Sequence, residues 1–187
     1  MKTTPLIFLR HANTQKDPLV NAAKWGLSED GKQQAKNVSE MPIMNFVDMI
    51  YVSEEQKTFL TIEPLAKKLN KKPQSLSFFN EVKRGDKFLT KEEFESEKAK
   101  QLTNLSYSAF DGESGIEALA RFKQGVDFVI KENQNKNILI VTHGTILSIY
   151  FANLLDAYAE LPNRWNRTDF CAIGVVENDK VIQDIIC

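Results

Sequence analysis

The chain has 187 residues, of which 42% are hydrophobic and 26% charged, a composition that fits one ordinary globular domain and argues against disorder. Its 24 basic and 25 acidic side chains nearly cancel, so the charge gives no reason to expect nucleic acid as a partner. No apolar run approaches the roughly 20 residues that span a bilayer, so no membrane partner is expected either. We find no internal repeat or linker and therefore treat 1–187 as a single domain.

The first apolar run, residues 5–9, ends at Arg10-His11. It is too short for the apolar region of a signal peptide and has no small-residue cleavage site after it, so we interpret it as a first strand. The two cysteines, Cys171 and Cys187, have no metal-site spacing and are too few for a disulfide framework. They suit a reducing compartment, and we expect a cytoplasmic protein.

In chain order, short apolar runs alternate with segments of helical spacing. The runs predict strands at 6–9, 46–52, 76–79, 138–142, 170–176 and 181–186, the last two paired through a turn at 177–179. Between them the pattern predicts a helix capped by Ser28, a helix over 59–69 that Pro64 kinks or splits, a helix over 113–132 and a buried helix over 144–155. This alternation favours an α/β fold, a three-layer α/β/α sandwich with a mostly parallel central sheet.

Residues 84–110 are less regular and rich in Lys, Glu and Ser, with some helical character near 91–100. We interpret this segment as an insertion that lies over the end of the sheet, above the active site.

The chain has only two histidines, and each directly follows a predicted strand. His11 comes after the first strand and next to Arg10, and His143 comes after 138–142 and next to Gly144. Ligands of open α/β sheets bind beyond the carboxyl ends of the strands, and a helix that starts with Gly favours an anion. An arginine, two histidines and a helix start therefore predict a phosphate site. For either histidine alone, a structural role at a loop remains the commoner outcome, and only the pair favours chemistry.

Six motifs in order resemble those of the histidine phosphatase superfamily, which has the phosphoglycerate-mutase-like fold, and in particular its small phosphatases. The motifs are Arg10-His11-Ala12-Asn13-Thr14, Leu27-Ser28-x-x-Gly31-x-x-Gln34-Ala35, Tyr51-Val52-Ser53-x-x-x-Lys57-Thr58-x-x-Thr61, Glu81-x-x-x-Gly85, Gly112-Glu113-Ser114 with Arg121, and Val141-Thr142-His143-Gly144. Each motif is weak alone, but six in order over most of the chain are specific.

The resemblance implies a role for each matched residue. His11 is the nucleophile that takes the phosphoryl group, its second ring nitrogen held by a backbone carbonyl, and Arg10 and His143 stabilise the phosphoryl oxygens. Glu81 is the proton donor, kept protonated by the anionic phosphate, with Glu113 as its nearest rival. Binding of the substrate is implied for Arg10, Thr14, Lys57, Arg84 and Gly144.

Two departures from the family pattern concern phosphate binding. Lys57 stands where the family has a second arginine, and it lacks the fork that grips two phosphate oxygens. An exposed helix lysine is the alternative interpretation of Lys57, and Arg84 is the alternative source of the missing guanidinium. Glu54 replaces a proline of the same motif, and Ala12 replaces a glycine.

We therefore expect a phosphomonoester hydrolase that needs no cofactor and acts on a small phosphorylated metabolite or a phosphoprotein, releasing inorganic phosphate. The alternatives are a mutase-type phosphotransferase, for which the chain is short, and a relative that binds phosphorylated ligands with little turnover. We expect no metal at the site, because no carboxylate or cysteine accompanies His11 and His143 at metal-site spacing.

Overall fold

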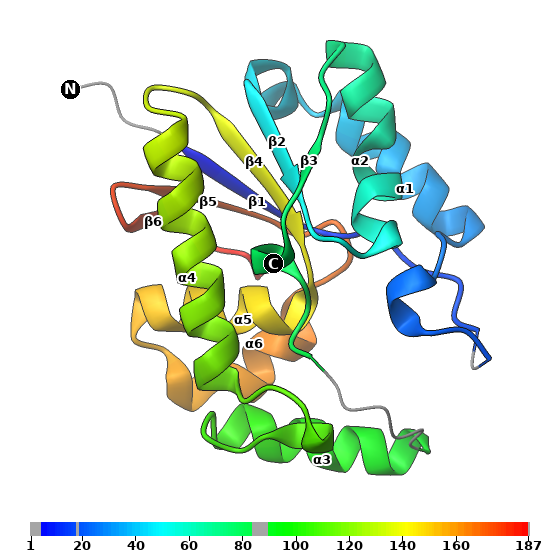
Figure 1. The fold of residues 1–187 in the computed structure, drawn as a ribbon, viewed down its shortest axis with the longest axis vertical. Helices are drawn as coiled ribbons and strands as arrows, with labels where there is room; N and C mark the ends of the chain where they lie inside the picture. Colours follow the sequence, from blue (N-terminus) through cyan, green and yellow to red (C-terminus); the bar gives the residue numbers. More distant parts are fainter. Residues whose placement is uncertain (1–4, 18, 84–89, 187) are drawn as a thin grey trace.

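A six-stranded sheet organises the chain (Figure 1). The structure, a computed structural model, describes residues 5–17, 19–83 and 90–186. The strands, in the order β3-β2-β4-β1-β5-β6, are β1 (Leu6–Arg10), β2 (Met49–Val52), β3 (Gln74–Ser75), β4 (Ile138–Thr142), β5 (Ile173–Glu177) and β6 (Lys180–Gln183). Strands β1 to β4 run parallel, whereas β5 is antiparallel to β1 and β6 is antiparallel to β5. The predicted mostly parallel sheet and its closing hairpin are confirmed.

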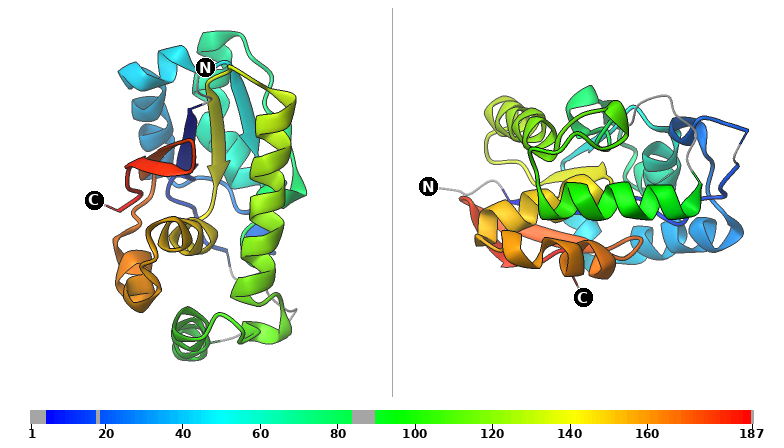
Figure 2. Two further views of the ribbon diagram at one scale, coloured as in Figure 1. Left: turned by 90° about the vertical axis from the view of Figure 1, so that its left-hand side faces the viewer. Right: turned by 90° about the horizontal axis from the view of Figure 1, so that it is seen from below.

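Helices cover both faces of the sheet, which confirms the three-layer sandwich (Figures 1 and 2). Helices α1 (Glu29–Glu40) and α2 (Gln56–Leu69) pack on one face, and α4 (Gly115–Glu132) and α5 (Gly144–Leu155) on the other. Helix α3 (Lys91–Thr103) packs against the short α6 (Leu161–Arg167) and lies beyond the carboxyl ends of the parallel strands.

Alternate residues of the central strands fill the two cores. On β1, Phe8 packs with α4 and α5, whereas Leu9 packs with α1 and α2, and both are 0% exposed. Ile140 and Val141 divide in the same way on β4. Burying a side chain of this size contributes about 1.5–3 kcal/mol, so strands that are apolar on both faces hold the three layers together.

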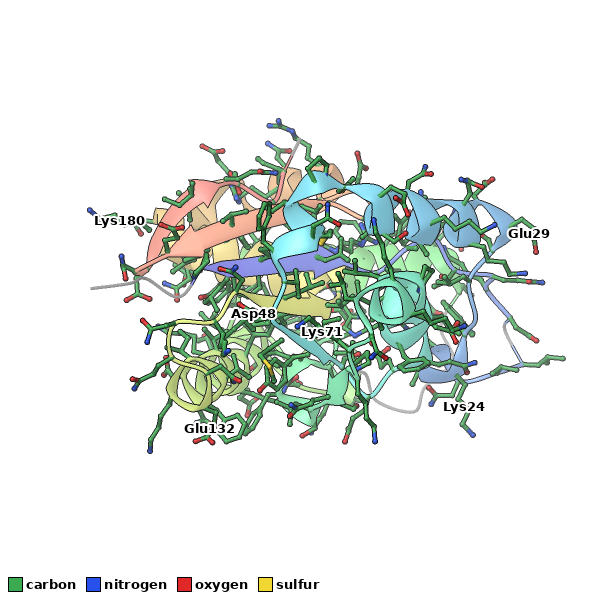
Figure 3. The ribbon with its side chains drawn as sticks, turned by 90° about the horizontal axis from the view of Figure 1, so that it is seen from above. Lys24, Glu29, Asp48, Lys71, Glu132 and Lys180 are labelled. Atoms are coloured by element: carbon green, nitrogen blue, oxygen red, sulfur yellow. The ribbon has the colours of Figure 1, made fainter. Side chains whose placement is uncertain are left out.

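Polar groups fix the two ends of the sandwich. At the amino ends of the strands, the Asp48 carboxylate accepts the Asn137 N–H at 2.9 Å, and Lys71 donates to the Asp48 carbonyl at 2.9 Å (Figure 3). At the other end, the Ser28 hydroxyl accepts the Gly31 N–H at 3.0 Å and caps α1 as predicted.

Several element boundaries differ from the predictions. Residues 76–79 are not a strand: Ser77–Phe79 form a 3-10 turn, and only Gln74–Ser75 pair with β2. The apolar run has a different cause, since Phe79 is fully buried in the core and Phe78 packs against Phe128. Phe46 is 70% exposed at the end of another 3-10 turn, so β2 starts later than predicted.

The helices show similar differences. Helix α2 is not split at Pro64 but continues through it, with Ile62 and Leu65 buried on either side. Packing against the sheet outweighs the loss of one backbone hydrogen bond at Pro64. Helix α4 begins at Gly115, with Ser114 as its cap, so Glu113 lies outside it.

Candidate active site

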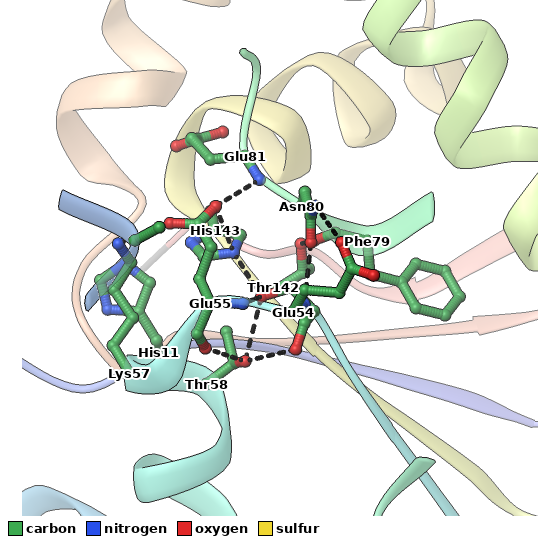
Figure 4. A network of polar contacts seen from close by, with 12 residues as sticks. His11, Glu54, Glu55, Lys57, Thr58, Phe79, Asn80, Glu81, Thr142 and His143 are labelled. Carbon is green, nitrogen blue, oxygen red and sulfur yellow. Dashed lines mark hydrogen bonds and ion pairs between the residues drawn. The ribbon is translucent and has the colours of Figure 1, made fainter. Parts of the chain in front are cut away.

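The register of β1 and β4 brings the two histidines together at the carboxyl edge of the sheet. Arg10 pairs with Thr142, so His11 and His143 follow at equivalent positions of neighbouring parallel strands. The His11 N–H donates to the Thr142 carbonyl at 2.9 Å, and the two ring centroids are 5.1 Å apart (Figure 4). The predicted arrangement of the strands thus yields a two-histidine cluster.

His11 has a defined tautomer. Its Nδ1 lies 2.8 Å from the Ala12 carbonyl, which can only accept a hydrogen bond. The proton therefore sits on Nδ1 and the lone pair on Nε2 is free. Burial, followed by the neighbouring His143, lowers the pKa of His11 well below its usual value, so the ring is neutral near pH 7. These are the properties that a nucleophilic imidazole requires.

His143 is fully buried behind this ring. Its Nε2 lies 2.8 Å from the Ser53 hydroxyl and 3.2 Å from Oε1 of Glu55. Because a carboxylate accepts only, Nε2 carries the proton, and Nδ1 is buried without a partner. Burial lowers the pKa of His143 to about 3, despite the opposing charge of Glu81.

Arg10 brings a cation to the same edge. Its Nη1 donates to the Thr168 carbonyl, and its guanidinium carbon lies 4.2 Å from the centre of the Phe170 ring. Gly144 makes room for this group, because a Cβ at that position would lie 2.9 Å from Arg10 Nε and from its Cζ. The structure thus gives Gly144 a spatial role that the sequence did not predict.

Two of the polar atoms in the site lack partners. Among the described residues, the buried side-chain nitrogens without a hydrogen bond are Arg10 Nε, His143 Nδ1 and Arg164 Nε. Buried polar groups are nearly always paired in native proteins. Unpaired nitrogens on Arg10 and His143 are therefore expected where a polar ligand completes the site.

Lys57 lies in the site and not on the surface. Only 6% of the residue is exposed, and its Nζ lies 2.6 Å from Oε2 of Glu55 and donates to the Ala22 carbonyl at 2.8 Å. The alternative of an exposed helix lysine is wrong. Glu55 is a site residue that the sequence does not indicate, because it stands in a run of polar residues without periodicity.

The Glu81 side chain is hydrogen-bonded to the backbone at the start of α5. Its carboxylate accepts the N–H groups of Thr145, Ile146 and Val82, each at 3.0 Å. Burial would raise the pKa of this carboxyl, but His143, Lys98 and the N–H donors of Thr145 and Val82 outweigh it and hold the pKa well below its usual value. Glu81 is thus ionised in the absence of phosphate, and its role as proton donor requires a bound anion that reverses this balance.

A second missed residue, Lys98, comes from α3. It is 2% exposed and donates to Gln101 at 3.0 Å and to the Thr145 hydroxyl at 3.3 Å. A buried lysine in a highly charged helix gives no sequence signal, because the same pattern is typical of an exposed face.

Glu113, the rival proton donor, is occupied elsewhere. Its two carboxylate oxygens accept hydrogen bonds from Arg121 at 2.8 and 2.7 Å. Arg121 also donates to the carbonyls of Phe78 and Asn80, at 2.7 and 3.1 Å. The Arg121–Glu113 pair thus holds residues 78–80, which directly precede Glu81, against α4.

The remaining predicted residues are less closely tied to the cluster. Thr14 is buried, and its backbone forms an isolated antiparallel β-bridge with Leu27. The role of Thr14 in substrate binding stays a prediction. Arg84 lies outside the described residues, as does Gly85 of the same motif.

Over 5–17, 19–83 and 90–186, no group of three His, Cys, Asp or Glu residues is arranged to hold a metal ion. In those same ranges no helix is both long and apolar enough to cross a membrane.

A mostly parallel sandwich with an arginine and two histidines at its carboxyl edge is a phosphoglycerate-mutase-like α/β protein. The family model of the histidine phosphatase superfamily (branch 1) matches residues 6–183, so the chain belongs to that superfamily. The predicted family resemblance is confirmed.

Solved structures share the fold at low sequence identity. A mycobacterial glucosyl-3-phosphoglycerate phosphatase is 16% identical with a TM-score of 0.79, over 99% of this chain and 100% of its own. A putative α-ribazole-5'-P phosphatase from Escherichia coli is 20% identical, with a TM-score of 0.75 over 98% of this chain and 96% of its own. A phosphoserine phosphatase mutant from Entamoeba histolytica is 23% identical, with a TM-score of 0.75 over 92% and 89%. Among curated proteins, none matches the sequence.

Proposed function

We propose that this protein is a phosphomonoesterase that works through a phosphohistidine on His11. The observation that carries the proposal is the state of that ring. Its Nδ1–H is fixed by the Ala12 carbonyl at 2.8 Å, the ring is neutral, and Arg10, Lys57 and His143 surround it. A free Nε2 lone pair beside fixed cations suits attack on a phosphoryl group.

The proposed reaction has two steps that use the same residues. His11 Nε2 forms a bond to phosphorus as the ester P–O bond breaks, and the leaving alkoxide takes a proton from Glu81. Water then attacks the phosphohistidine, the P–N bond breaks, and the Glu81 carboxylate takes the proton of the water. The products are an alcohol and inorganic phosphate.

Glu81 can serve only if phosphate binding changes its protonation. A phosphoryl dianion next to the carboxylate raises its pKa and opposes the three N–H donors of Val82, Thr145 and Ile146. General acid help of this kind contributes about 10²–10⁴-fold to the rate. The charge of Arg10, together with the Nε2–H of His143, would hold the phosphoryl oxygens during both steps.

A small phosphorylated metabolite is the favoured substrate class. The solved structures named above are of phosphatases named for small phosphate esters, and one was obtained in complex with phosphoserine. A phosphoprotein remains the alternative substrate, and mutase-type phosphotransfer remains the alternative reaction. We place the reaction in the cytoplasm, on the same argument from the two cysteines.

A second candidate function is recognition of a phosphorylated ligand with little turnover. The pairing of Lys57 with Glu55 favours this second function. This lysine stands where the family has an arginine, and its charge is already balanced by the Glu55 carboxylate.

A phosphatase screen tests the proposal. We expect the protein to release phosphate from one of a panel of sugar phosphates, nucleotides, phosphoglycerates, phosphoamino acids and phosphopeptides, in the presence of a chelator. His11→Ala should abolish the activity at unchanged thermal stability. Binding of a panel member without release would favour the second candidate, and activity in His11→Ala would refute the mechanism.

A further inference from the structure

The Glu55 carboxylate lies among hydrogen-bond donors of the site. Oε2 lies 2.6 Å from Lys57 Nζ, and Oε1 lies 3.2 Å from His143 Nε2 and accepts the Glu81 N–H at 2.9 Å. Figure 4 shows Glu55 between Glu81 and the side chains of Lys57 and His143. Three donors from three segments of the chain thus converge on one carboxylate.

This position is not a by-product of helix capping. Glu55 is the N-cap residue of α2, yet its side chain makes no capping hydrogen bond. The side chain is 14% exposed, and its carboxylate is held by Lys57, His143 and the Glu81 N–H instead. A carboxylate held this way, with a cation and two N–H donors, reproduces the contacts that two phosphoryl oxygens make at a binding site.

The charges of the site lead to the same conclusion. Arg10, Lys57 and Lys98 contribute three positive charges, the two histidines are neutral, and Glu55 and Glu81 contribute two negative charges, which leaves one net positive charge. A phosphoryl dianion entering this site meets only one net positive charge while Glu55 stays in place, and two once that carboxylate has moved away. The dianion can contact Lys57 and the Nε2–H of His143 only after the Glu55 carboxylate has moved away from them.

We infer that Glu55 sets the affinity of the site for phosphate by competing, as a resident anion, for Lys57 and His143. The inference rests on the proposed function, because it takes the phosphoryl group to bind at these donors. Its consequence is weak binding of inorganic phosphate, so that the product leaves readily and only substrates with further contacts displace Glu55.

The test compares the affinity for inorganic phosphate, measured by titration calorimetry, between the parent protein and Glu55→Gln. Removing the charge frees Lys57, so the variant should bind phosphate about tenfold more tightly or better, which corresponds to a modest Coulomb interaction at this range. Glu63→Gln is the matched control: it removes the same charge from a partly exposed position on α2, where Glu63 pairs with Lys67, and should leave the affinity unchanged.

A second variant covers failure of the first to fold. Glu55→Asp keeps the charge but shortens the side chain by one methylene, which draws the carboxylate away from Lys57 Nζ, and it should bind phosphate more tightly than the parent. Equal or weaker binding by both variants would overturn the inference while leaving the proposed function intact, provided the parent hydrolyses a substrate. If Glu55→Gln binds phosphate no more tightly and loses turnover, Glu55 takes part in the chemistry and the inference fails. Absence of phosphate binding and of hydrolysis in every variant would refute the proposed function as well.

Discussion

Arg121 on α4 holds the backbone that positions Glu81, and replacing it tests this role directly. Its guanidinium binds both oxygens of Glu113 and two carbonyls of the segment that precedes Glu81. The side chains of Arg121 and Glu113 are 15% and 11% exposed, so both are largely shielded from water. Arg121→Met keeps most of the stem and removes all of these hydrogen bonds.

The size of the effect follows from the burial of the pair. Breaking a buried ion pair by removing one partner costs about 3–5 kcal/mol, and the remaining exposure reduces this to about 2–4 kcal/mol. The double variant with Glu113→Gln should lose less than the sum of the two single variants, by about 1–3 kcal/mol, because the two side chains contact each other. The free energy of unfolding is measured by urea denaturation at constant m value. Lys123→Met, an exposed lysine of the same helix, is the control and should stay within about 0.5 kcal/mol of the parent.

The same variant reports on catalysis. A displaced Glu81 should slow hydrolysis of alkyl phosphates more than that of p-nitrophenyl phosphate, whose leaving group hardly needs a proton. Additive losses of stability in Arg121→Met and Glu113→Gln would refute the pairing. A stability loss with unchanged rates on both substrates would refute its role in positioning Glu81.

Three further predictions follow from the site. Lys57→Arg should preserve or tighten binding of inorganic phosphate in calorimetry and Lys57→Ala should weaken it, whereas unchanged affinity in both would exclude Lys57 from the phosphate site. Gly144→Ala should lower turnover about tenfold or more while the protein stays folded, because the new Cβ would displace the Arg10 guanidinium; parental turnover would show that Arg10 is not needed where it lies. The free energy of unfolding, measured in urea, should fall as the pH drops below the ordinary histidine pKa of 6.5, because the unfolded chain takes up protons that folded His11 and His143 refuse. The slope should reach ~1.4 kcal/mol per pH unit for each histidine, and His143→Asn should reduce it; a flat profile between pH 6.5 and 4.5 would contradict the buried neutral rings.

Much of the fold could be predicted because burial and sequence pattern coincide. Strand β4 is apolar at every position but its last and is buried on both faces, so its sequence has one interpretation. The run at 76–79 differs from the prediction because a short apolar segment fits a buried turn as well as a strand, and periodicity cannot separate the two. Helix α6 was not predicted, since its sequence LPNRWNR has no helical period of apolar residues.

The site shows the same division. The two histidines and Arg10 could be placed because each follows a strand, and strand ends are fixed by the sheet register. Glu55 and Lys98 could not be predicted, because their positions depend on contacts between distant segments, from Glu55 to Glu81 and from Lys98 to Thr145. Glu81 was identified by resemblance, but its ionised state results from N–H donors of α5 that no local pattern indicates.

The central claim is that phosphate passes through His11, and trapping the intermediate tests it most directly. Phosphohistidine is labile in acid and fairly stable in base, so turnover with labelled substrate is quenched in base and the digested peptides are examined by mass spectrometry. The label should appear on the peptide that contains His11 and should persist in His143→Ala, where turnover is slow but the nucleophile is intact. It should vanish, together with turnover, in His11→Ala. Label on His143, or turnover by His11→Ala, would contradict the mechanism.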